Sequence, residues 1–133
     1  MAVAAGMSVE QRMRNYIAVL AIAACAGCGD RVERHTVESI DEVCLAGAET
    51  LRAKFATCLS SSCDTLVSAT CSIARAGEEA VITGRAEIDR QGDVCTTDCG
   101  LVEATCEGNL GEAARVRVGT SVVDRSALEP CSR

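Results

Sequence analysis

Residues 58–71 read CLSSSCDTLVSATC, and residues 95–106 read CTTDCGLVEATC. From Leu66 and Leu101 onward the two stretches align without a gap at an offset of 35 residues. Nine of the 25 aligned positions, 66–90 against 101–125, are identical. Because two copies are too few for a solenoid, we predict an internally duplicated hairpin, with repeat copies at 58–90 and 95–125.

Each copy of the repeat has the pattern strand, turn, strand. In LVEATC, the residues Val102, Ala104 and Cys106 alternate with Glu103 and Thr105, which places the two sets on opposite faces of a strand. The turns are expected at 77–79, which begins with Gly77, and at 108–111, which begins and ends with glycine. Both Cys106 and its repeat equivalent Cys71 are therefore predicted to face the core. A disulfide from one of them could join two sheets.

The remaining pattern extends this prediction to the rest of the chain. We expect short strands near 42–46, 50–57, 66–74, 80–88, 101–107 and 114–124. Regularly spaced short strands are typical of a sandwich, so the predicted fold is all-β. It is a small, disulfide-braced antiparallel β-sandwich, Ig-like, over residues 42–133.

One segment, 37–59, has two readings. Five apolar or cysteine residues recur there at helical spacing, and Ser39 to Glu42 resembles a capping box: Ile40, Cys44, Leu51, Phe55 and Cys58. The alternation of Leu51, Ala53 and Phe55 with Arg52 and Lys54 instead predicts a strand. Gly47 would weaken a helix interior, so the strand is favoured.

The core is expected to be thin, because small residues dominate and Phe55 is the one aromatic residue after Tyr16. Disulfides would compensate. Eight cysteines of the predicted domain form an even set: Cys44, Cys58, Cys63, Cys71, Cys95, Cys99, Cys106 and Cys131. The alternative is zinc bound by thiolates, but the close spacings are C-x4-C and C-x3-C with no histidine nearby. Disulfides are therefore predicted, and spacing alone does not choose their pairing.

The N-terminal stretch Tyr16–Asp30 reads YIAVLAIAACAGCGD and follows Arg12 and Arg14. Its apolar run is much shorter than the ~20 residues that a membrane-spanning helix needs. Basic residues followed by a short apolar run and small residues are typical of a signal peptide.

The end of that run, Ile22-Ala23-Ala24-Cys25, resembles the lipobox of bacterial lipoproteins. The resemblance implies that residues 1–24 are cleaved and that the Cys25 thiol carries a diacylglyceryl group. Its new amino group would carry a fatty acid such as palmitate. Cys28 is the alternative lipidation site, and cleavage before it would leave eight other cysteines instead of nine. Residues 25–41 would then be a lipid-anchored tether that holds His35 in solvent.

The compartment that follows is the cell envelope, on a periplasmic or outer-surface face, with the N-terminal lipid in a membrane. A net charge of −6 disfavours nucleic acid as a partner. The cysteine layout also resembles small cysteine-rich β-sandwich lipoproteins of soil bacteria such as myxobacteria. Cys25 and Cys28 form a CxxC pair as well, which is a redox motif only in a suitable α/β context.

Catalytic patterns are weak. A serine nucleophile needs a base, and the sequence after the signal offers His35 and Lys54 but no GxSxG. Asp89, Asp93 and Asp98 are a weak calcium-site hypothesis. We expect no enzyme and no cofactor. The predicted function is a non-catalytic binding or structural module for an unknown envelope protein or surface ligand. The alternatives are a thiol-active or metal-binding envelope protein and a small hydrolase.

Overall fold

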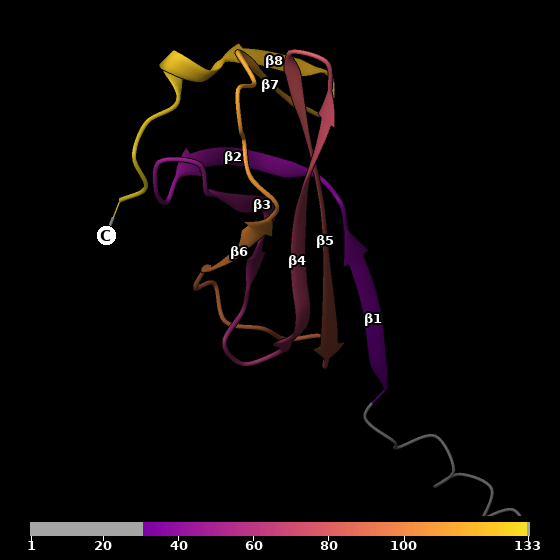
Figure 1. Cartoon of the computed structure of the whole chain (residues 1–133). Helices are drawn as coiled ribbons and strands as arrows, with labels where there is room; N and C mark the ends of the chain where they lie inside the picture. Colours follow the sequence, from indigo (N-terminus) through magenta and orange to yellow (C-terminus); the bar gives the residue numbers. More distant parts are fainter. Residues whose placement is uncertain (1–30, 133) are drawn as a thin grey trace, which may run out of the picture. The chain divides into compact units, whose positions relative to one another are not determined.

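The computed structural model of the chain describes residues 31–132, which contain eight β-strands and one short 3-10 helix (Figure 1). No α-helix occurs in this part of the chain. The elements are β1 (Val32–Val37), β2 (Ile40–Leu45), β3 (Leu51–Leu59), β4 (Asp64–Ala76), β5 (Glu79–Gln91), β6 (Gly100–Glu107), β7 (Arg115–Val118), β8 (Ser121–Asp124) and η1 (Arg125–Ala127). The predicted all-β class is confirmed. The signal peptide, the lipidated cysteine and the first part of the tether lie outside the described residues.

The centre of the fold is the long hairpin of β4 and β5, the first repeat copy. The two strands pair antiparallel from Asp64↔Arg90 to Ala76↔Glu79, with one bulge between Leu66 and Ser68. The turn between them contains Gly77 at φ 65°, a left-handed conformation that glycine adopts without a Cβ clash. The predicted strand, turn, strand pattern is confirmed for this copy.

The second copy does not repeat this long hairpin, because its predicted second strand at 114–124 is divided into β7 and β8, which pair antiparallel with each other. Its strands flank the first hairpin instead: β6 pairs parallel with β4, and β7 pairs parallel with β5. Cys71 pairs with Cys106, its repeat equivalent, whereas Val116 pairs with Ala80 and not with Val81. The pairing is therefore shifted by one residue from the repeat alignment. Because side chains alternate between the two faces of a strand, the shift places the fully buried Ala80 and Val116 on the same face.

The strands form one curled mixed sheet in the order β2-β3-β6-β4-β5-β7-β8, with β1 also paired to β5. The Ig-like sandwich of two antiparallel sheets is therefore not confirmed; the arrangement is closer to a half-barrel. The end strands β2 and β8 approach one another because the C-terminal segment returns to β2. The Leu45 amide donates to Glu129 O at 2.8 Å, and the Cys131 amide donates to Leu45 O at 2.9 Å.

The core lies on the concave side of this sheet. Its largest fully buried side chain is Phe55 of β3, which packs against Gly84 of β5. The predicted inward residues of β6 are confirmed, with Val102, Ala104 and Cys106 all buried. Most of the other buried residues are alanine, valine, leucine, isoleucine or cysteine, so the core is as thin as expected.

Segment 37–59 forms β2 and β3, so the strand reading is confirmed and the helical one is wrong. The tether prediction, 25–41, needs a correction at its C-terminal end, since Val32–Val37 forms β1. β1 pairs along Ala86 to Gln91 of β5 (Figure 1). Its side chains are almost all exposed, because pairing of its backbone with β5 holds the strand in place. The sequence therefore shows no apolar alternation there, and the strand was not predicted.

Candidate functional site

All eight cysteines of the described residues are paired in disulfides. The bridges are Cys44–Cys131, Cys58–Cys99, Cys63–Cys95 and Cys71–Cys106, with Cα–Cα distances of 4.9, 4.8, 5.5 and 4.2 Å. The predicted set is confirmed and now has a connectivity. Cys25 and Cys28 lie outside the described residues.

The four disulfides join different parts of the fold. Cys71–Cys106 is buried and joins the two repeat copies. Cys44–Cys131 fixes the C-terminal segment to β2. The other two, Cys58–Cys99 and Cys63–Cys95, hold the loop after β5 against the end of β3 and the turn that follows it. Such cross-links stabilise a small domain mainly by restricting its unfolded chain.

A gap interrupts one edge of β5. β4 covers the other edge along the whole strand, whereas this edge is shared by β7, which pairs with 79–82, and β1, which pairs with 86–91. Residues 83–85 therefore have no ladder partner on this edge within the described chain. The corner between β1 and β2 and the turn between β7 and β8 flank the gap, which we call the β5 notch (residues 83–85).

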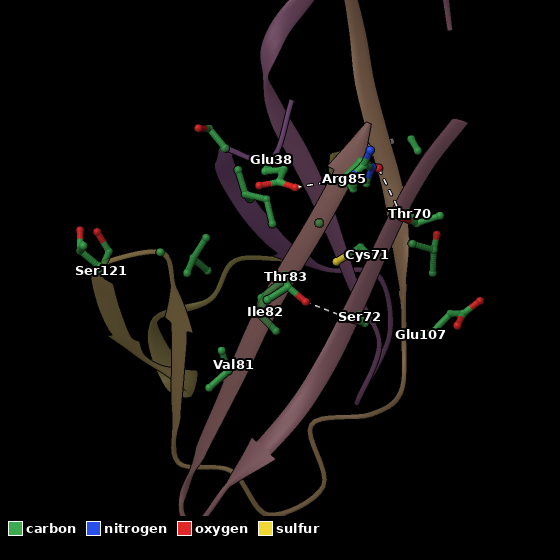
Figure 2. A pocket seen from close by; sticks show the side chains of 18 residues that line it. Glu38, Thr70, Cys71, Ser72, Val81, Ile82, Thr83, Arg85, Glu107 and Ser121 are labelled. Atoms are coloured by element: carbon green, nitrogen blue, oxygen red, sulfur yellow. Dashed lines mark hydrogen bonds and ion pairs between the residues drawn. The ribbon is translucent and has the colours of Figure 1, made fainter. Parts of the chain in front are cut away.

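The β5 notch opens onto a groove of about 1110 Å³ that crosses the β4–β5 hairpin (Figure 2). Side-chain hydroxyls are frequent in its lining, among them Thr70, Ser72, Thr83, Thr105, Thr120 and Ser121. Ser72 and Thr83 hydrogen-bond each other at 2.8 Å between their oxygens, as Figure 2 shows. The groove therefore presents hydroxyl donors and acceptors beside apolar residues of the hairpin such as Val81 and Ile82.

Arg85 is the cation of this groove. Its guanidinium lies 3.6 Å from Glu38 Oε1 (Figure 2). It also lies 3.1 Å from Glu87 Oε1. Two carboxylates therefore neutralise it, and Glu107 adds a further carboxylate to the lining. The groove has an acidic balance despite its one arginine.

A second, smaller pocket of about 370 Å³ lies between β2 and the β7, β8 and η1 segment. We call it the seam pocket, because it lies where the two ends of the curled sheet approach each other. Six apolar residues line it: Ile40, Val43, Val118, Val123, Ala127 and Leu128. It shares Ile40, Val118 and Ser121 with the groove, so the two cavities are adjacent.

Carboxylates surround the seam pocket. Asp41, Glu42 and Glu129 belong to its lining, and the Lys54 ammonium lies 3.9 Å from both Asp41 Oδ2 and Glu42 Oε2. Three carboxylates against one ammonium leave a net charge of −2 beside an apolar cavity. The combination suits a ligand with an aliphatic group and a positive charge.

The three aspartates of the calcium hypothesis are not brought together. Asp89 receives hydrogen bonds of 2.7 and 2.9 Å from the Arg34 guanidinium, which lower the pKa of its carboxyl. Asp98 receives hydrogen bonds from Thr96 and from the Ser61 amide, which lower the pKa of its carboxyl. No group of metal-ligating side chains large enough to hold an ion occurs between residues 31 and 132.

The two basic residues considered for catalysis lie on different strands, β1 and β3. His35 is on the exposed strand β1, with its Nε2 atom 4.0 Å from Glu33. Lys54 is on β3 beside the rim of the seam pocket. Neither side chain hydrogen-bonds to a serine within residues 31–132.

Sequence reasoning missed the β5 notch and the seam pocket, because their residues come from distant strands. The sequence contained one indication of this region, because glycine occurs at the equivalent positions 84 and 119 of the two repeat copies. They serve different purposes, since Gly119 occupies the β7–β8 turn at φ 58°. Gly84 instead makes room for Phe55.

No protein-family model, no curated protein and no solved structure matches this chain. Within residues 31–132, no helix has the length and hydropathy to cross a membrane.

Proposed function

We propose that the chain is an exported, lipid-anchored protein of the bacterial cell envelope, and that its β domain is a non-catalytic binding module. The observation that carries this proposal is the set of four disulfides, which uses every cysteine between residues 31 and 132. Disulfides persist in oxidising compartments such as the periplasm and the cell surface.

The N-terminal lipobox-like sequence supplies the anchor. Lipid on Cys25, or on Cys28 instead, would hold the protein in a membrane, firmly so with two or more acyl chains. β1 begins at Val32, so residues 26–31 would span at most about 20 Å when fully extended. The domain would therefore stay near the membrane surface and meet its partner there.

The groove and the seam pocket supply the binding surface. Pockets that combine apolar walls with a few polar groups are typical ligand sites, and both cavities are built from strands that the disulfides brace. The partner would be an envelope protein or a surface ligand.

Intact-mass spectrometry of the protein from native envelopes, with and without reductant, tests the proposal. The expected mass is that of a chain cleaved before Cys25 or Cys28 and carrying acyl chains. Reduction should add eight hydrogens, two for each of the four disulfides. Cys25→Ser and Cys28→Ser are matched variants, and only one should abolish lipidation. An unprocessed cytosolic chain with all ten cysteines as free thiols would refute export. Thiols that react with an alkylating reagent before any reductant is added would favour a thiol-active protein.

A further inference from the structure

We propose that the β5 notch and the seam pocket together bind an extended peptide segment of an envelope protein. One aliphatic side chain of that segment enters the seam pocket, and a lysine or arginine two residues away lies against its acidic rim. The inference rests on the binding function proposed above and specifies its ligand.

The backbone of the segment would pair with β5. Residues 83–85 lie between the ends of β1 and β7, so their backbone lacks a neighbouring strand on that edge. An exposed sheet edge is a template for an added strand, and main-chain hydrogen bonds then supply much of the affinity. The notch is short, so it selects a few residues of extended chain and excludes a long strand.

The seam pocket would select one side chain. Ile40, Val118 and Leu128 are half-buried and continuous with the core, while Val123 is 39% exposed at the pocket wall. An aliphatic side chain that enters would remove this apolar surface from water, which is favourable in proportion to the area buried. Because the pocket and the groove share Ile40, Val118 and Ser121, they are adjacent, and in the proposed complex one short segment spans both.

The charge of the rim would select a second side chain of the peptide, a basic one. The rim of Asp41, Glu42 and Glu129 is offset only by Lys54. Arg85 at the notch is already flanked by Glu38 and Glu87. A segment with a lysine or arginine near its aliphatic residue is therefore favoured, and an acidic segment is repelled.

A small cationic amphiphile is the competing occupant. Its aliphatic chain would fill the seam pocket and its positive charge would interact with the acidic rim. It would, however, leave the backbone of residues 83–85 without a hydrogen-bonding partner. The peptide uses the notch, the pocket and the rim together, and we therefore assign the site to a peptide.

Fluorescence anisotropy of labelled peptides with the purified, oxidised full-length protein tests the assignment. The first probe is Thr-Thr-Leu-Thr-Lys-Thr. Replacing its leucine with serine, or its lysine with glutamate, should each weaken binding about tenfold. Methylating the backbone nitrogens at residues 2 and 4, or at residues 3 and 5, should weaken binding for one set only, because alternate residues of a paired strand face the partner.

Two neighbouring valines of β8 provide matched variants. Val123 lines the seam pocket and Val122 does not, while their exposures are 39% and 41%. Val123→Glu should abolish detectable binding, and Val122→Glu should leave it within about twofold. Far-UV circular dichroism and the mass shift on reduction check that both variants fold.

Several results would overturn the assignment. They are no saturable binding of the first probe, equal losses for the two valine variants, or indifference to both methylation sets. Binding of dodecylamine with none of the peptide would identify a small-amphiphile site instead. Peptide binding that ignores Val123→Glu would overturn this site while leaving a binding module, so it is distinguishable from failure of the proposed function.

Discussion

Cys71 and Cys106 occupy the same position in the two repeat copies, and they are joined by a disulfide across the parallel strands β4 and β6. Their Cα atoms are 4.2 Å apart, and both residues are about 4% exposed. The duplication thus places a residue next to its own copy, and the cross-link holds the second copy against the first.

Removing the buried Cys71–Cys106 bridge should destabilise the protein more than removing the exposed Cys58–Cys99 bridge. Loops of 35 and 41 residues predict similar losses, about 4 kcal/mol each, from the entropy of the unfolded chain. Cys71→Ala with Cys106→Ala also leaves a cavity, which adds about 1 kcal/mol. Urea unfolding of this double variant and of Cys58→Ala with Cys99→Ala measures the difference. A smaller loss at the buried pair would contradict the prediction.

Gly84 should not tolerate a side chain. A Cβ atom there would lie 2.9 Å from Phe55 Cζ and 3.1 Å from Ile40 Cδ1, and Phe55 is fully buried. We expect Gly84→Ala to lower the free energy of unfolding by about 1–3 kcal/mol. Gly47→Ala is the control, because its nearest neighbours would be 3.8 Å away. Equal stability of the two variants would show that the Phe55 contact is not tight.

Leu110 was expected in a turn but is fully buried. Its position in the connection between β6 and β7 makes it part of the core, and Leu110→Ala should cost about 2–5 kcal/mol in a denaturant titration. Leu101, which is 57% exposed, offers the same substitution without a cavity and should change stability by less than about 0.5 kcal/mol. If the two variants behave alike, Leu110 does not belong to the core.

The ion pair between Arg34 and Asp89 should make β1 docking sensitive to acid. Hydrogen bonds from Arg34 lower the pKa of Asp89 in the folded protein below its value in the unfolded chain. The stabilisation is therefore present above the unfolded pKa of about 3.9 and is lost as pH falls through the folded value. Urea unfolding near pH 6 and pH 2 should show a smaller loss of stability for Asp89→Asn than for the unchanged protein.

Asp93→Asn controls for the removal of a carboxylate, since Asp93 is exposed in the loop after β5. Its pH dependence should match that of the unchanged protein. A matching profile for Asp89→Asn as well would mean that the contact with Arg34 does not contribute to docking.

Local pattern was enough to predict several strands and their inward faces. The alternation in Val102, Ala104 and Cys106 identified the buried face of β6, and the alternation around Phe55 identified β3. The same method missed β1, because Glu33, Arg34 and His35 have no apolar alternation. It also assigned a hairpin to both repeat copies, since similar sequences have similar local preferences.

The sequence by itself determined the strands β2 to β6, the inward faces of β3 and β6, and that the cysteines after the signal-like segment form an even set. These properties depend on neighbours within a few positions, where the two-residue period of a strand is visible. The tertiary structure alone decided that β6 and β7 flank the β4–β5 hairpin, that Cys71 meets Cys106 and that the sheet curls. The β5 notch and the seam pocket exist only because β1, β2, β5, β7 and β8 converge, and contacts between distant segments leave no periodic trace in the chain.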